Sequence, residues 1–243
     1  MKNKLKYQLW SRELSFKKKV DGAKRIIEKS IDYSHYVSWS GGKDSSVVLH
    51  LCTSFISDIP VLYIKSGYAI PESYQFMQNI VKSMNLNYTE LQIEIDYMEL
   101  CKEFGLPHMR DKNTQNKVVS MIKKNPANEW AKANKFTGMF WGLRAEESLG
   151  RKAFLQYKGR KYIDKNGIER ISPIIDFTIN DVWAYHYAND IPINPIYLKE
   201  NCGQSAETIR NTGWLSTDGE NNGRIQWLRT NYPEQFQKIR ELL

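Results

Sequence analysis

The sequence is poor in cysteine, and its few cysteines follow no pattern typical of metal binding or of disulfide bonding. Cys52, Cys101 and Cys202 are the three present among 243 residues, and they lie far apart in the chain. An odd and sparse set of this kind does not form a disulfide framework, and no Cys-x-x-Cys pair or Cys/His cluster has zinc spacing. An iron–sulfur cluster normally takes four thiolates from one chain, one more than this sequence contains. We therefore expect neither an iron–sulfur cluster nor a structural zinc site.

Long apolar runs are missing as well. A membrane-spanning helix needs about 18 or more consecutive apolar residues, and the sequence contains no such run. The first residues, MKNKLKYQLWSREL, carry lysines but neither the apolar core nor the small-residue cleavage site of a signal peptide. We expect a cytoplasmic protein that does not bind membranes. Its apolar content of 41% is ordinary for a globular chain.

Acidic residues are fewer than basic ones, which gives the chain a formal net charge of +8. The basic residues are spread out, for example in Lys17–Lys19, in Lys123–Lys124 and between Arg151 and Arg170. A positive balance attracts polyanions, from nucleotides to nucleic acids. Because most such runs are solvated helix faces, nucleic acid is only a secondary candidate partner. A protein partner or a homodimer also stays open.

Segments typical of buried strands alternate with segments typical of helices over much of the chain. The β-forming runs lie at residues 35–39, 60–64, 87–95 and 137–141. Helical patterns separate them, at residues 45–55, 71–84 and 96–135, the last with a break near Gly105. This alternation predicts an α/β fold with an open parallel sheet and helices on both faces.

Two further elements are expected outside this alternation. Residues 11–30 predict an amphipathic helix before the first strand. Residues 153–157 and 161–171 predict a small hairpin, whose turn is Lys165-Asn166-Gly167.

The strongest functional signal is the run Ser40-Gly41-Gly42-Lys43-Asp44-Ser45-Ser46, which joins the first strand to the helix after it. Two glycines let the backbone turn sharply and bring its N–H groups close to an anion. The start of the following helix adds N–H donors and the positive end of the helix dipole. The charge of Lys43 completes a set of groups that suits phosphate, together with the hydroxyls of Ser40, Ser45 and Ser46. The alternative is a plain glycine turn between a buried strand and a helix.

The spacing excludes the two commonest phosphate loops. A Walker A loop separates its first glycine from Gly-Lys by four residues, and a dinucleotide fingerprint needs a third glycine. The run instead resembles the PP-loop of the ATP pyrophosphatase superfamily, whose members cleave ATP between the α and β phosphates. The resemblance implies a Rossmann-like fold of the adenine nucleotide alpha hydrolase type.

The end of the second strand supplies a second resemblance. Lys65, Ser66 and Gly67 lead to Pro71-Glu72. This segment resembles the Asp-Thr-Gly-aromatic run before Pro-Glu in 3′-phosphoadenylyl sulfate (PAPS) reductases and their sulfate adenylyltransferase relatives. Here Lys65 replaces the acid and Ser66 the threonine, which would add positive charge near the phosphates. A tight turn before a helix explains the same residues.

The end of the fourth strand carries an arginine motif. Gly142 would allow close approach, and the guanidinium of Arg144 suits phosphate or sulfate. Arg151 follows seven residues later, so on a helix it would share a face with Arg144, and Glu147 could hold either one. With Ser148, these residues resemble the Gly-x-Arg-x-x-Glu-Ser-x-x-Arg pattern of the same family, whose arginines face the sulfonucleotide or the ATP phosphates. A surface helix with weak salt bridges is the alternative.

A fourth match is structural. Residues 173–183 resemble the Pro-Leu-x-x-Trp-Thr-x-x-Asp-Val-Trp segment of the family, and residues 191–197 resemble the Asn-Pro-Leu-Tyr that follows it. Thr178, with Asp181 three residues later, predicts a capping box and hence a helix start. We assign no chemistry to it.

These motifs favour an enzyme that cleaves ATP between the α and β phosphates and adenylates an acceptor. The loop would hold the leaving pyrophosphate and Lys43 would offset its charge. Asp44 would position a Mg²⁺ that arrives with the nucleotide, or cap the helix, while Arg144 and Arg151 would clamp the α-phosphate or the acceptor. We expect a helical segment at residues 1–33, the nucleotide-binding domain at 34–197, and an extension packed on it at 198–243.

Two alternatives involve the last third of the chain. The family resemblance allows a reductase of PAPS or adenylyl sulfate (APS) that uses Cys202. A lone cysteine, however, is more often a packing residue. Cys52 lies in an apolar helix and is expected in the core. A nucleotide- or nucleic-acid-binding module is the other alternative. In it, two tryptophans would stack on bases beside two arginines: Trp214, Trp227, Arg224 and Arg229.

Overall fold

The computed structural model describes residues 4–66, 70–107, 110–202, 209 and 223–240. Its strands form one six-stranded sheet in the order β3-β2-β1-β4-β6-β5. In chain order the strands are β1 (His35–Ser38), β2 (Val61–Ser66), β3 (Tyr88–Ile93), β4 (Gly138–Phe140), β5 (Lys161–Ile163) and β6 (Glu169–Ile171). The predicted α/β fold with an open, Rossmann-like sheet is confirmed.

The middle of the sheet is parallel. Val37 of β1 pairs in parallel with Val61 of β2 on one side and with Phe140 of β4 on the other. Phe140 in turn pairs with Ile171 of β6. All four of these side chains are fully buried, and each such burial contributes about 1.5–3 kcal/mol. Because the strands are parallel, the loops that follow β1 and β4 leave the sheet at the same edge.

The edge strand β5 runs antiparallel to β6, and the two form the hairpin expected around Gly167. The predicted contribution of residues 153–157 to this hairpin is wrong. They belong to helix α8 (Leu149–Lys158), which begins after Ser148, whose hydroxyl accepts a hydrogen bond from the backbone N–H of Arg151. Phe154 and Tyr157 favour a strand by composition, but an N-cap and one buried position, Leu155, suit a surface helix better.

The other helices follow the expected order. The helical pattern at residues 96–135 is interrupted where predicted, because α5 ends at Phe104 and Gly105 takes a left-handed φ of 74°. No helix in the described part of the chain combines the length and apolar character that spanning a membrane requires. The remaining α-helices are α1 (Lys4–Trp10), α2 (Leu14–Ser30), α3 (Lys43–Thr53), α4 (Pro71–Ser83), α5 (Tyr97–Phe104), α6 (Lys112–Val119), α7 (Asn125–Ala133), α9 (Ile179–Ala188), α10 (Arg224–Asn231) and α11 (Pro233–Arg240), with a π-helical turn η2 (Ser120–Lys124) and 3-10 turns η3 (Ala145–Glu147) and η4 (Pro195–Leu198).

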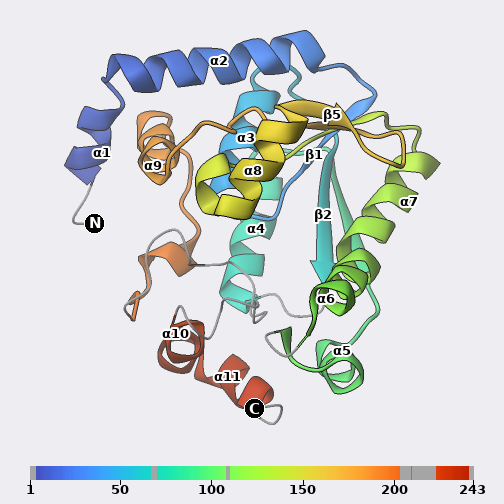
Figure 1. Cartoon of the computed structure of the whole chain (residues 1–243). Helices are drawn as coiled ribbons and strands as arrows, with labels where there is room; N and C mark the ends of the chain where they lie inside the picture. Colours follow the sequence, from blue (N-terminus) through green and yellow to red (C-terminus); the bar gives the residue numbers. More distant parts are fainter. Residues whose placement is uncertain (1–3, 67–69, 108–109, 203–208, 210–222, 241–243) are drawn as a thin grey trace. The chain divides into compact units, whose positions relative to one another are not determined.

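The chain divides into two compact units. The first comprises Met1–Tyr63, Ile80–Thr89 and Trp130–Ile193, and contains the loops after β1 and β4. Within it, the long helix α2 buries Phe16, Ala23 and Ile27, and α1 lies beside α9 (Figure 1).

The second unit comprises Ile64–Asn79, Glu90–Glu129 and Asn194–Leu243. Its core gathers around Trp227, which is fully buried with Ile70, Ile196 and Leu228. The tail therefore shares a core with residues that come much earlier in the chain. The domain boundaries expected at residues 34 and 198 stay a prediction.

Candidate functional site

The strand–glycine turn–helix predicted around the SGGKDS run is present in the first unit. We call residues 40–46 the glycine loop. Strand β1 ends at Ser38 and helix α3 begins at Lys43, with Gly42 as its N-cap. Gly41 has a φ of 71°, a left-handed conformation that glycine adopts without strain. Since an N-cap glycine has no side chain, the first turn of α3 is approached through backbone N–H groups.

The serine hydroxyls of the loop take part in bonds within it. Ser45 Oγ donates to the Gly42 carbonyl at 3.0 Å and lies 3.1 Å from Ser40 Oγ. Ser46 Oγ accepts from Trp39 Nε1 at 3.1 Å. Ser45 and Ser46 are buried, whereas Ser40 is exposed. These bonds hold the turn in shape, and contact of the three hydroxyls with pyrophosphate stays a prediction.

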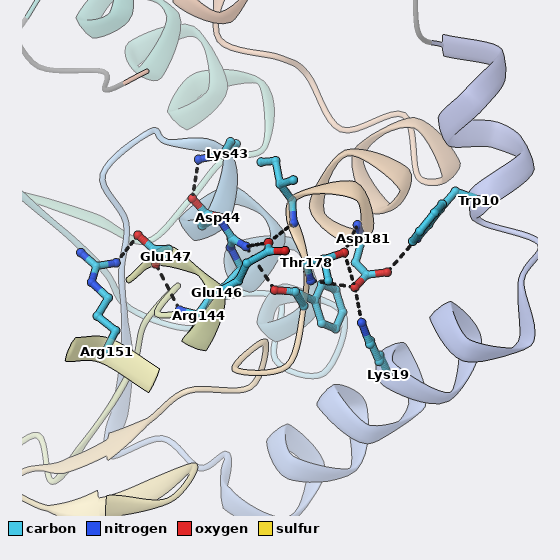
Figure 2. A network of polar contacts seen from close by, with 12 residues as sticks. Trp10, Lys19, Lys43, Asp44, Arg144, Glu146, Glu147, Arg151, Thr178 and Asp181 are labelled. Carbon is cyan, nitrogen blue, oxygen red and sulfur yellow. Dashed lines mark hydrogen bonds and ion pairs between the residues drawn. The ribbon is translucent and has the colours of Figure 1, made fainter. Parts of the chain in front are cut away.

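A chain of charges begins at the start of α3 (Figure 2). One carboxylate oxygen of Asp44 lies 3.0 Å from Lys43 Nζ, and the other accepts from Arg144 Nε at 2.6 Å. Lys43 is 2% exposed and Arg144 is fully buried. Burial alone would raise the pKa of Asp44, but the two cations outweigh it and hold that pKa below its usual value. Asp44 is therefore an ionised link between the helix start and the loop after β4.

Arg144 has further internal partners. Its Nη1 lies 3.0 Å from Glu146 Oε2 and donates to the Phe177 carbonyl at 3.1 Å. A phosphate clamp by Arg144 stays a prediction, and it would require the guanidinium to exchange some of these partners for the ligand.

Arg144 and Arg151 do not share a helix, so the predicted common helix face is wrong. Arg144 precedes the 3-10 turn η3, whereas Arg151 lies in α8. Ser148, between them, takes an extended backbone conformation and caps α8, which breaks the helical path. Glu147 contacts both, as expected: its carboxylate accepts from the Arg144 backbone N–H at 3.2 Å and pairs with the Arg151 guanidinium. Arg151 is 40% exposed, so it can meet a ligand from solvent.

Gly142 permits a close approach, and the group that approaches is part of the protein. A Cβ atom at residue 142 would lie 2.7 Å from the backbone carbon of Asp44 and 2.7 Å from the nitrogen of Ser45. The chain after β4 thus passes directly against the first turn of α3. This contact explains how Arg144, two residues later, reaches Asp44.

Lys65 belongs to the second unit and already has partners there. Its Nζ lies 3.2 Å from Glu90 Oε1 and 4.1 Å from the centre of the Tyr74 ring, and the Tyr74 hydroxyl donates to Glu90 at 3.0 Å. Partial burial opposes the charge, but Tyr74 and Glu90 raise the pKa of Lys65 overall. Strand β2 ends at Ser66, and Gly67 lies outside the described residues. Sequence reasoning missed Glu90 and Tyr74, because neither lies in a motif.

The capping box predicted in α9 is confirmed, and its acid does more than cap. Asp181 bonds to the backbone N–H and hydroxyl of Thr178. The same buried carboxylate accepts from Trp10 Nε1 at 2.8 Å and from Lys19 Nζ at 2.5 Å (Figure 2). Helices α1 and α2 are therefore attached to α9. No local spacing could have revealed these bonds, which cross more than 160 residues of sequence.

His186, also on α9, is another residue that sequence reasoning missed. Its Nε2 lies 2.8 Å from the carbonyl oxygen of Lys43, inside the glycine loop. The available signal was a histidine at the end of the buried run that follows Asp181.

The predictions for the cysteines and for the tryptophans of the tail differ in outcome. Cys52 is fully buried as expected, and burial raises the pKa of its thiol. Cys202 is half-buried, 3.9 Å from Asn231 Nδ2. The predicted stacking of Trp227 on bases is wrong, since this side chain is fully buried beneath Arg224. Trp214 lies outside the described residues. Among the residues that the structure describes, no group of three or more His, Cys, Asp or Glu side chains could hold a metal ion.

Comparison with known proteins supplies the family. The model of the phosphoadenosine phosphosulfate reductase domain matches residues 34–230. A phosphoadenosine 5′-phosphosulfate reductase of Xanthomonas axonopodis pv. citri is 34% identical over 170 residues, which cover 66% of this chain and 65% of that protein. An uncharacterized protein of Methanocaldococcus jannaschii is 29% identical over 229 residues, or 93% of this chain and 52% of that one. The chain thus spans about half to two thirds of the length of these curated relatives.

Solved structures agree on the fold. A PAPS reductase of Candida auris aligns with a TM-score of 0.54 at 16% identity, over 72% of this chain and 82% of that one. An FMN adenylyltransferase of Candida glabrata in complex with ATP aligns with a TM-score of 0.52 at 14% identity, over 78% and 60%. The U34-tRNA thiolase NcsA of Methanococcus maripaludis, with its 4Fe-4S cluster, aligns with a TM-score of 0.56 at 12% identity, over 92% and 77%. With the family model spanning most of its length, the chain belongs to the phosphoadenosine phosphosulfate reductase domain family.

Proposed function

We propose that this chain binds an adenine nucleotide at the glycine loop and cleaves ATP between the α and β phosphates, transferring the adenylyl group to an acceptor. The observation that carries the proposal is the turn at Gly41 and Gly42 into the start of α3, where no side chain caps the helix and Lys43 is the first residue. Backbone N–H groups at a helix start, together with a lysine, form a binding site for phosphate.

In the proposed step, an oxygen of the acceptor attacks the α-phosphorus. The bond from that phosphorus to the oxygen bridging it to the β-phosphate breaks, and pyrophosphate leaves with the electron pair. The acceptor loses its proton to solvent. Negative charge therefore grows on the pyrophosphate, where the N–H groups of the first α3 turn and the ammonium of Lys43 would stabilise it. A bound phosphate would share Lys43 with Asp44.

The Mg²⁺ that accompanies ATP would enter as part of the substrate. Asp44 fits a direct metal ligand poorly, because Lys43 and Arg144 each hold one of its two carboxylate oxygens. A metal ion there would have to displace a cation. The role of Asp44 that fits its contacts better is to orient Lys43 and Arg144.

A second candidate function is the reduction of PAPS, and the relatives named as PAPS reductases favour it. Reducing the sulfuryl group to sulfite takes two electrons, which two thiols supply by becoming a disulfide. Cys202 is the best-placed of the three cysteines, since Cys52 and Cys101 are buried. A thiol reductant would supply the second thiol. The bonds that would hold the adenine nucleotide are the same in both proposals.

One experiment separates the two candidates. Purified protein is given ATP with Mg²⁺, and pyrophosphate release is measured; in parallel it is given PAPS with a dithiol, and sulfite is measured. Adenylyl transfer predicts pyrophosphate release that falls about 100-fold or more in Lys43→Ala and is unchanged in Cys202→Ser. Sulfite release that disappears in Cys202→Ser would instead establish the reductase, and a failure to bind either ATP or PAPS in calorimetry would contradict both.

A further inference from the structure

Helix α9 reaches into the glycine loop through one side chain. Nε2 of His186 lies 2.8 Å from the carbonyl oxygen of Lys43, and the imidazole is only 2% exposed. A carbonyl can only accept a hydrogen bond, so Nε2 carries the proton and donates it. Residue 186 is 143 positions from its partner, and the bond joins two elements that local sequence does not relate.

The peptide unit that receives this bond has a special place in the helix. Lys43 and Asp44 are the first two residues of α3. Because the two ends of a peptide unit point in opposite directions along a helix, the Lys43 carbonyl points into the helix and the Asp44 N–H points out of its start. That N–H is among the first-turn donors without a carbonyl partner one turn earlier. A donor on the carbonyl side fixes the orientation of this unit and polarises its N–H toward an anion.

The surroundings of the donor favour its uncharged form. Burial is the largest influence on His186 and lowers its pKa; the Lys43 ammonium acts in the same direction, while the Asp44 carboxylate and the Lys43 carbonyl oppose it without reversing it. A neutral imidazole can strengthen the peptide dipole without adding a second cation behind Lys43. It therefore leaves the charge balance of Lys43, Asp44 and Arg144 intact.

We propose that His186 is a positioning residue for the glycine loop, which holds the Lys43–Asp44 peptide in the orientation that binds the nucleotide phosphates. The inference rests on the proposed function, and it names a residue of the same site that lies outside every motif. Loss of the donor should weaken phosphate binding and leave the fold standing.

The same two helices provide a matched control. His50 of α3 lies 3.1 Å from the Tyr185 hydroxyl of α9, so this pair also joins α3 to α9 through one hydrogen bond. His50 is seven residues further along α3 than Lys43, about 10 Å at 1.5 Å per residue. Tyr185→Phe removes a bond between the same helices without touching the glycine loop.

The test compares wild type, His186→Leu, His186→Gln and Tyr185→Phe as full chains. Calorimetry gives the Kd for ATP and for inorganic pyrophosphate, and hydrogen exchange of the ligand-free proteins reports on the amides at residues 43–47. We expect His186→Leu to raise both Kd values about fivefold, the range of one net hydrogen bond, and to speed exchange in the loop. His186→Gln, which places an amide donor near the position of Nε2, should stay within about twofold of wild type. Tyr185→Phe should match wild type in binding, even if its melting temperature falls as far as that of His186→Leu.

Three results would overturn the proposal, and they distinguish the failure of the proposed function from the failure of this inference. Wild-type protein that binds neither ATP nor pyrophosphate would remove the proposed function and this inference with it. Wild-type binding that His186→Leu reproduces, or a loss in Tyr185→Phe equal to that in His186→Leu, would refute the role of His186 alone and leave the nucleotide site standing.

Discussion

At the scale of single residues, the glycine loop is held by groups that come from elsewhere in the first unit. Arg144 binds the Asp44 side chain and His186 binds the Lys43 carbonyl. Gly142 lets the chain after β4 pass against the backbone of Asp44 and Ser45. The sequence was enough to predict Lys43, Gly142 and Arg144 as candidate site residues, because they belong to motifs with fixed spacing. It could not show that Arg144 faces inward, since its partners Asp44 and Phe177 lie 100 and 33 residues away.

Replacing Gly142 with alanine should destabilise the protein. The new Cβ would lie 2.7 Å from backbone atoms of α3, which cannot move without shifting the helix. We expect a loss of about 1–3 kcal/mol in the free energy of unfolding, measured by urea denaturation. Gly150→Ala is the matched control, because a Cβ there would meet only Ser148 Oγ at 4.0 Å and lies in a helix. Equal stability of the two variants would contradict the close contact.

Asp181 predicts how stability responds to acid. Burial raises its pKa, but bonds from Lys19, Trp10 and Thr178 outweigh burial and lower it. A folded-state pKa below the unfolded value, about 3.9, means that the contribution is complete above that pH and is lost as pH falls through the folded-state pKa. Asp181→Asn should therefore flatten the decline of unfolding free energy below about pH 4. Asp58→Asn, at an exposed position, is the control for the substitution itself.

At the scale of elements, α9 is a junction. It receives α1 and α2 at Asp181 and contacts the start of α3 through His186. Thr178 and Asp181 predicted where α9 begins, Pro71 predicted the start of α4, and the alternation of apolar runs predicted the parallel strands. Residues 153–157 were assigned to a strand because aromatic side chains favour strands by composition, whereas the cap at Ser148 decides for helix.

Trp10→Phe tests the junction from the N-terminal side. The substitution keeps an aromatic ring and removes the donor to the buried Asp181 carboxylate. A hydrogen bond to a charged group contributes about 1.5–3 kcal/mol, so we expect a loss of that size in unfolding free energy. Lys6→Ala, on the same helix, removes an exposed contact to Asn180 and one to the Tyr7 ring, and should change stability by less than about 0.5 kcal/mol. A Trp10→Phe variant as stable as Lys6→Ala would mean that Asp181 does not depend on α1.

At the scale of the whole molecule, the net charge of +8 should act on nucleotide capture. A net positive charge attracts the negatively charged ATP at long range. Salt screens this attraction beyond the Debye length, which is about 10 Å at 0.1 M salt. We expect the association rate for ATP, measured by stopped flow, to fall as salt rises from about 0.05 to 0.5 M, with a smaller change in the dissociation rate. A dissociation rate that carries the whole salt effect would place the attraction in local contacts instead.

The contact at residue 142 has a consequence for evolution of the family. Two segments that are far apart in sequence, the first turn of α3 and the exit from β4, leave no room between them for even a methyl group. A homologue with a larger residue at this point must have moved its first helical turn outward, together with the backbone N–H groups of that turn. Substitutions at the two segments should therefore occur together, and a relative that has lost this glycine should have a differently placed turn between β1 and α3.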